Sequence, residues 1–312
     1  MCKDPVATAR GSDTKQAHRI MPGEEEEKQI TTAEADLIAS SLPLKGNDYY
    51  IVLLPTPEGH VEEPILTEAA KLLQLKTAVL SRIVALRQPL PATRTTTVEA
   101  AREITEALRA LGIESTTVPS HELHLEESSK KICAFEFSDE VLTATLVGSN
   151  ARVSAGWDEL ILLVTGRLVL SRIEVEERRR RGRKQTVNSR HLSADESVLD
   201  VYLAASEVNW RIRASSFDFS CLGSGRSVTT FGNFRVLMNV LRERATKAQF
   251  DDSYGQARSA LEIVWPLEPQ TRIGDWRRGG AGKVDTATVT TTDNEDQFTR
   301  YSRLRHYLRT RA

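Results

Sequence analysis

The stretch from Ser197 to Arg244 changes its hydrophobic period once, and this change limits what the surrounding chain can fold into. Val208, Trp210 and Ile212 alternate with polar residues, which is the period-2 pattern of a strand buried on one face. Beyond two glycines the apolar residues repeat at helical spacing instead: Phe234, Leu237, Met238 and Leu241. Strands followed by one amphipathic helix predict a small β-barrel or sandwich whose open end is closed by that helix.

A β-rich domain is therefore expected from residue 131 to residue 265. Apolar runs predict its strands, ahead of the helix at about Thr230–Arg244: Ile132–Phe137, Val141–Val147, Val153–Trp157, Leu160–Leu170, Arg172–Glu176, Val198–Leu203 and Val208–Arg213. The phrases Val153–Ile161 and Trp210–Phe219 resemble the pleckstrin-homology-like fold. The resemblance implies a bent β-barrel with its open corner filled by the helix. That fold carries lipid-binding, peptide-binding and scaffold roles, so it selects no activity.

Residues 48–120 predict a separate α/β domain in the order β-α-α-β-α-β. Tyr49–Leu54 is the first buried strand, and Gly112 ends the last helix. The side chains expected in its core are Ile51, Leu53, Leu72, Ile83, Ile104 and Leu108. This order, and the segment Glu99–Ile113 most closely, resembles the C-terminal domain of the bacterial ribosomal stalk protein. The lysine-rich helix of that family is not reproduced, so factor binding is not carried over.

Polar segments are expected at both ends of the chain. Residues 1–47 lack a visible core and predict mostly disorder, with a short helix at about Glu24–Ile38. Residues 266–312 predict a tail that ends in a basic helix. The fold class is thus α+β: a small β-α-α-β-α-β sandwich, a pleckstrin-homology-like bent barrel capped by a helix, and disordered tails. The whole ordering resembles uncharacterised bacterial proteins, which supplies no activity.

Composition excludes several classes of protein. The 42 basic and 43 acidic residues nearly cancel, so net charge predicts neither a nucleic acid nor a membrane as partner. The 3 cysteines are widely spaced and form no C-x-x-C pair, which disfavours a disulfide framework or a four-thiolate zinc site. The longest apolar run, Leu160–Leu170, is far shorter than the roughly 20 residues of a membrane span. A cytoplasmic protein is therefore expected.

Two short motifs approach known chemistry without completing it. His121 and His124 lie at i, i+3, whereas a zincin needs histidines at i, i+4 on one helical face. Gly279–Lys283 has Arg277 where a phosphate-binding loop needs glycine, and Val284 follows its lysine in place of serine or threonine. Neither a metal, a cofactor nor an enzymatic reaction is predicted.

The strongest local feature is a run of basic residues between two predicted strands. It consists of Arg178, Arg179, Arg180, Arg181, Arg183 and Lys184, with Glu174, Glu176 and Glu177 before it. A second set lies on the final helix: Arg300, Arg303 and Arg305. Such clusters bind phosphates of nucleic acids or anionic lipid head groups. The alternatives are a solvated loop neutralised by its own glutamates, and a helix docked on its own domain.

The sequence as a whole favours a non-enzymatic interaction or scaffold protein that binds an unidentified protein partner. The other hypothesis is a binder of anionic surfaces, either lipid or nucleic acid, through Arg178–Lys184 and the C-terminal helix.

Overall fold

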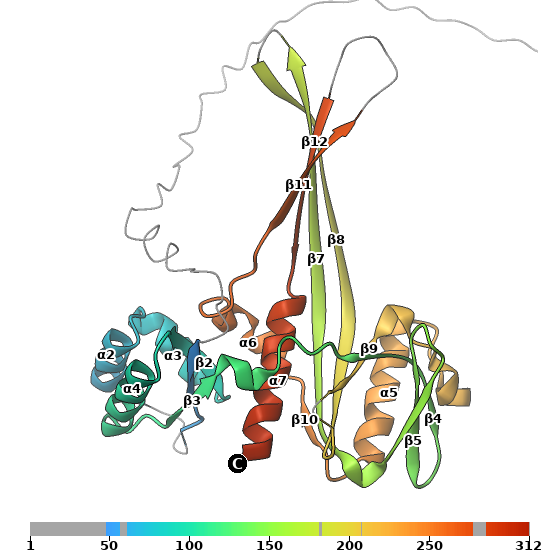
Figure 1. Ribbon diagram of the computed structural model, residues 1–312, viewed down its shortest axis with the longest axis horizontal. Helices are drawn as coiled ribbons and strands as arrows, with labels where there is room; N and C mark the ends of the chain where they lie inside the picture. Colours follow the sequence, from blue (N-terminus) through green and yellow to red (C-terminus); the bar gives the residue numbers. More distant parts are fainter. Residues whose placement is uncertain (1–47, 57–60, 181–182, 207, 277–284, 312) are drawn as a thin grey trace, which may run out of the picture. The chain divides into compact units, whose positions relative to one another are not determined.

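The computed structural model describes residues 48–56, 61–180, 183–206, 208–276 and 285–311, although only the backbone of 176–180, 183–188, 274–276 and 285–287. Across these residues the fold is mixed α+β, as expected, with a three-stranded sheet and a nine-stranded sheet (Figure 1). None of the described helices combines the length and the apolar character that crossing a membrane requires. The segment 1–47, with its expected Glu24–Ile38 helix, lies outside the described residues.

The first part of the chain has the predicted order of elements. These are β1 (Tyr49–Leu53), α2 (Glu63–Leu72), α3 (Thr77–Ala85), β2 (Leu90–Thr95), α4 (Val98–Ala110) and β3 (Ser115–Pro119). The strands pair antiparallel in the order β2-β1-β3. Helix α4 begins at a Thr97 cap, whose hydroxyl accepts the Ala100 N–H. It ends before Gly112, whose φ of 77° favours glycine.

One residue of the expected core was placed wrongly. Leu72 is 38% exposed, whereas the neighbouring Leu73 is 1% exposed and packs inside. Ile51, Leu53, Ile83 and Leu108 are buried as expected, and Ile104 packs partly buried against them. The error arises because Leu72 and Leu73 both fit the helical stripe. Since the helix ends at Leu72, the chain turns there and directs only Leu73 inward.

The large sheet has the order β11-β12-β7-β8-β9-β4-β5-β6, with β10 parallel to β7. Its strands are β4 (Lys130–Phe137), β5 (Val141–Leu146), β6 (Arg152–Gly156), β7 (Leu160–Arg180), β8 (Arg183–Leu203), β9 (Trp210–Arg213), β10 (Gln249–Asp251), β11 (Gln270–Trp276) and β12 (Asp285–Asp293). Most neighbouring strands are antiparallel, but β4 and β9 are parallel. A second core lies on this sheet, where α5 (Thr230–Arg244) packs against Phe135 and Trp210.

Strands β7 and β8 are much longer than predicted. The expected strands Leu160–Leu170 and Arg172–Glu176 form one strand of 21 residues, and Val198–Leu203 is only the end of another of 21 residues. Figure 1 shows the two strands side by side along their length. Leu170, Ile173 and Leu192 are exposed in this extension. None of the described side chains at 171–175 and 189–197 is buried, so no hydrophobic alternation revealed the extension.

The predicted C-terminal tail is also structured. Strand β12 pairs with β7 and β11 pairs with β12, and α7 (Glu295–Arg311) follows. Phe298, Tyr301 and Leu304 on α7 belong to the core that also contains Tyr50 and Trp265. The rings of Tyr50 and Trp265 meet edge to face with centroids 5.4 Å apart. Helix α6 (Tyr254–Leu261) contributes to the same core.

Candidate functional site

A buried polar network joins α7 to strands β8 and β9. The guanidinium of Arg211 donates to both carboxylate oxygens of Asp200, with Nε–Oδ1 and Nη2–Oδ2 distances of 2.7 Å each. The Ser302 hydroxyl donates to Asp200 Oδ2 at 2.7 Å and lies 2.8 Å from the Tyr202 hydroxyl. The third guanidinium nitrogen, Nη1, donates to the Thr299 hydroxyl at 2.9 Å.

Two groups of this network, Arg211 and Tyr202, have shifted pKa values. Burial lowers the pKa of Arg211, but the adjacent Asp200 carboxylate more than offsets this, so its pKa lies above the ordinary value. For the neutral hydroxyl of Tyr202, burial acts in the other direction and raises the pKa far above its usual range. A general acid or base needs a pKa near the working pH. Arg211 and Tyr202 are therefore unsuited to proton transfer, and the contacts of the network position α7.

A half-exposed extension of the network surrounds the start of α7. Glu295 forms an ion pair with Arg213, and Arg213 Nη1 lies 3.6 Å from Glu196 Oε2. Burial raises the pKa of Glu295, but the hydrogen bond and the charge of Arg213 more than offset this, so the net shift is downward. The carboxylate thus stays ionised beside its arginine.

The three arginines predicted to bind anions on α7 all contact other parts of the chain. Arg300 Nη1 donates to the Tyr50 hydroxyl at 3.4 Å, and Arg303 Nη2 donates to the Glu127 carbonyl at 3.2 Å. Arg305 Nε lies 2.5 Å from Asp251 Oδ2. Arg303 is only 3% exposed, so it is a packed residue of the helix and not part of an open surface.

The other predicted set lies at the end of the β7–β8 hairpin. The run was expected in a loop, but its described residues belong to the two strands, because their backbones continue the antiparallel ladder. The register pairs Arg178 with Gln185, Arg179 with Lys184, and Arg180 with Arg183. Arg181 lies outside the described residues. The hairpin thus brings basic residues 178–180 and 183–184 to one end of the sheet.

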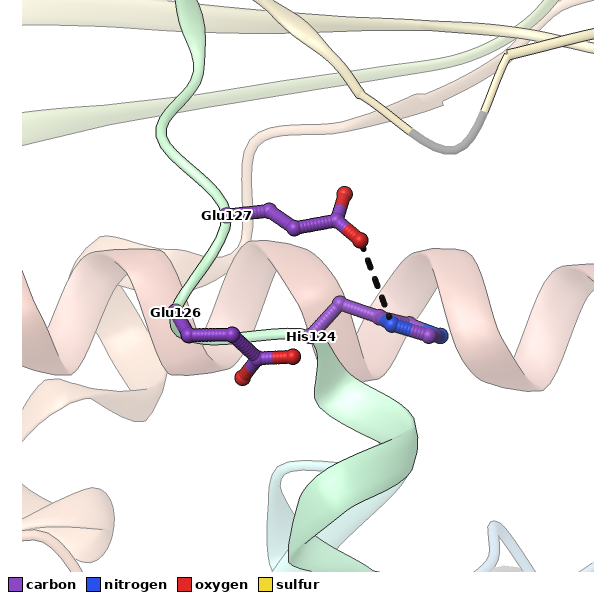
Figure 2. Close-up of side chains that lie close together, drawn as sticks. All are labelled: His124, Glu126 and Glu127. Carbon is purple, nitrogen blue, oxygen red and sulfur yellow. Dashed lines mark ion pairs between the residues drawn. The ribbon is translucent and has the colours of Figure 1, made fainter.

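A third group has side chains that could hold a metal ion. It consists of His124, Glu126 and Glu127, whose ligand atoms lie within 4.8 Å of one another. Figure 2 shows the Glu127 carboxylate directed at the imidazole, with Oε1 3.6 Å from Nδ1. His121, whose spacing from His124 disfavoured a metal site, is not in the group. Arg303 donates to the Glu127 carbonyl and so places a permanent positive charge beside these ligands, which weakens their attraction for a cation.

Comparison with known proteins returned no match: neither a family model, a curated protein nor a solved structure resembles the chain closely enough to be identified. Its function has to be inferred from the residues described above.

Proposed function

We propose that this chain is a non-enzymatic interaction protein of the cytoplasm that binds nucleic acid through the end of its β7–β8 hairpin. The observation that carries the proposal is the register of the last three described pairs, which gathers five basic residues: Arg178, Arg179, Arg180, Arg183 and Lys184. Phosphate contacts from such a cluster supply affinity without requiring a particular base sequence.

The distribution of the cations favours nucleic acid over a membrane. Residues directly opposite each other in an antiparallel pair share one face, and successive residues alternate between faces. Arg180 and Arg183 therefore belong to one face of the hairpin, and Arg179 and Lys184 to the other. A flat lipid surface can contact the cations on only one face of the hairpin. The major groove of DNA, about 12 Å wide, admits a two-stranded ribbon, and the phosphates along its two edges can then meet the cations on both faces.

The finer fold assignments are part of this proposal. We infer a pleckstrin-homology-like bent barrel from the meanders β4-β5-β6 and β7-β8-β9, which support it together with the buried helix α5. We infer a small sandwich similar to the ribosomal stalk domain from the order β1 to β3. Binding of a protein partner is a second candidate function, favoured by the exposed Val228 and Phe231 near the start of α5.

Fluorescence anisotropy of a labelled 20-base-pair DNA duplex and of a labelled RNA hairpin tests the proposal. Replacing the four arginines of 178–181 by glutamine should abolish binding at moderate salt. At low salt, where the variant still binds, the plot of log binding constant against log salt concentration should be less steep by about 3–4, since each phosphate contact contributes about 0.9 to that slope. A control with the same change of charge replaces the exposed Arg102, Arg109, Arg226 and Arg235 and should bind as the unaltered chain does.

Two results would overturn the proposal. One is equal loss of binding in both four-residue variants, which would assign the effect to net charge. The other is binding to phosphatidylserine vesicles without binding to either nucleic acid, which would make the ligand a membrane.

A further inference from the structure

A cavity of about 420 Å³, lined by both polar and apolar side chains, lies beside the C-terminal half of α7. Its walls come from separate parts of the chain: Thr116 on β3, Gln249 at the start of β10, and Arg305, Tyr307, Arg309 and Arg311 on α7. The remaining wall is apolar and comes from leucine and proline side chains. No aspartate or glutamate of the described residues lines the cavity. Its volume is in the range of small-molecule sites.

Arg305 is the arginine held most firmly at this cavity. Its Nε lies 2.5 Å from Asp251 Oδ2, and the Tyr301 hydroxyl, 3.0 Å from each carboxylate oxygen, fixes Asp251 in turn. The side chain is only 13% exposed, and its Nη1 atom is buried without a hydrogen-bond partner among the described residues. Because this Nη1 atom has no exposed surface, only the remaining part of the Arg305 side chain meets the cavity.

The other two arginines differ in how they are held. Arg311 Nη2 donates to Glu122 Oε2 at 2.7 Å, Nη1 donates to the Tyr307 hydroxyl at 3.2 Å, and its guanidinium carbon lies 4.6 Å from the Tyr307 ring centroid. Arg309 is exposed and follows Arg305 by four residues, so both project from the same face of the helix. Carboxylates of Asp251 and Glu122 balance two of the three cations, which leaves Arg309 as the excess positive charge.

We propose that this cavity binds a small organic phosphate. Arg309 would bind the phosphate oxygens, because its guanidinium fork matches that geometry, and Arg305 adds a second guanidinium to the wall. Thr116 and Gln249 can supply further hydrogen bonds, and the apolar wall takes the organic part of the ligand. This binding site is separate from the hairpin end and does not depend on nucleic acid binding there.

Isothermal titration of the full chain with phenyl phosphate tests the assignment. Saturable binding of one equivalent is expected, with phenol and inorganic phosphate each at least tenfold weaker because each lacks one half of the ligand. Arg309→Gln should weaken phenyl phosphate binding at least tenfold, whereas Arg235→Gln, an equal loss of charge on the exposed side of α5, should leave it unchanged. Thr116→Val should also weaken it, without any change of charge.

Three outcomes overturn the proposal. The first is no saturable binding of phenyl phosphate by the unaltered chain, and the second is equal affinity in the Arg309→Gln and Arg235→Gln variants. In the second case Arg309 serves only to offset the negative end of the helix dipole, and its loss would lower thermal stability alone. The third is benzoate binding at least as tightly as phenyl phosphate, which would make the ligand a carboxylate. Retained phenyl phosphate binding in the glutamine variant of 178–181 separates this site from the hairpin end.

Discussion

Replacing Arg211 by methionine should be among the most damaging single changes in this protein. The side chain is 7% exposed and that of Asp200 is 0% exposed, so the substitution leaves a fully buried carboxylate without its bidentate partner. Methionine fills similar space along the aliphatic part of the arginine, so the main loss is electrostatic. Two hydrogen bonds of 2.7 Å and the donor to Thr299 disappear together.

The expected cost follows from what remains after the substitution. Removing one partner of a buried ion pair typically destabilises a protein by about 3–5 kcal/mol, because the other charge stays buried. For a chain of this size, each kcal/mol lowers the melting temperature by roughly 2–4 °C. Arg211→Met should therefore lower the free energy of unfolding by about 3–5 kcal/mol and the melting temperature by roughly 10 °C.

Urea unfolding followed by circular dichroism measures the effect, with Arg213→Met as the matched control. Arg213 is two residues further along the same strand and forms ion pairs with Glu196 and Glu295, but it is 35% exposed. An ion pair of that exposure contributes about 0–1 kcal/mol. Adding Asp200→Asn to Arg211→Met should recover much of the loss, because the unpaired charge is removed. Equal costs for the two methionine variants would refute the reasoning.

Two further predictions concern packing and pH. Gly166→Ala should lower the free energy of unfolding by about 1–3 kcal/mol in thermal unfolding, because the added Cβ would lie 2.8 Å from ring atoms of α6 and α7. Gly255→Ala is the control: its Cβ would meet open space, so it should stabilise α6 by about 0.5–1 kcal/mol. The pKa of His306 is lowered to about 4, chiefly by burial and then by the charges of Arg303 and His124. Between pH 6.5 and 4 the unfolded chain therefore binds more protons than the folded chain, so the free energy of unfolding falls as pH is lowered. A His306→Gln variant should lose part of that pH dependence, and an unchanged profile would contradict it.

The elements that could be predicted from sequence are those that bury one face. Helix α5 was placed at Thr230–Arg244 because its apolar stripe packs on the second core and its polar face does not. The extension of β7 and β8 carries no such signal, since Leu170 and Leu192 are exposed and polar residues occupy both faces. Strands β11 and β12 were missed for the same reason. Their threonines have strand propensity but no periodic burial.

For the polar residues of the candidate site, the sequence predicts which types occur but not which of them lie together. A basic stripe on the final helix was visible in the spacing of Arg300, Arg303 and Arg305. No pattern along the chain shows that Asp251 and Glu127, from distant segments, lie against that stripe. The buried pair of Asp200 and Arg211 was equally hidden, since both occupy polar positions of strands whose outer face was expected to meet water.

The arginines of α7 and those of the hairpin therefore differ in what they can do. On α7, Arg303 and Arg305 are ordered by contacts with the rest of the fold, so a ligand that meets Arg305 gains a donor whose conformational entropy has already been lost. In the last pairs of β7 and β8, five cations are brought together, with Glu177 before Arg178 and Asp285 opposite it among the described residues. Mutual repulsion there is relieved by any polyanion that approaches. Substitutions should consequently separate the two regions: at Arg305 they alter stability and ligand affinity together, whereas at the hairpin end they alter affinity alone.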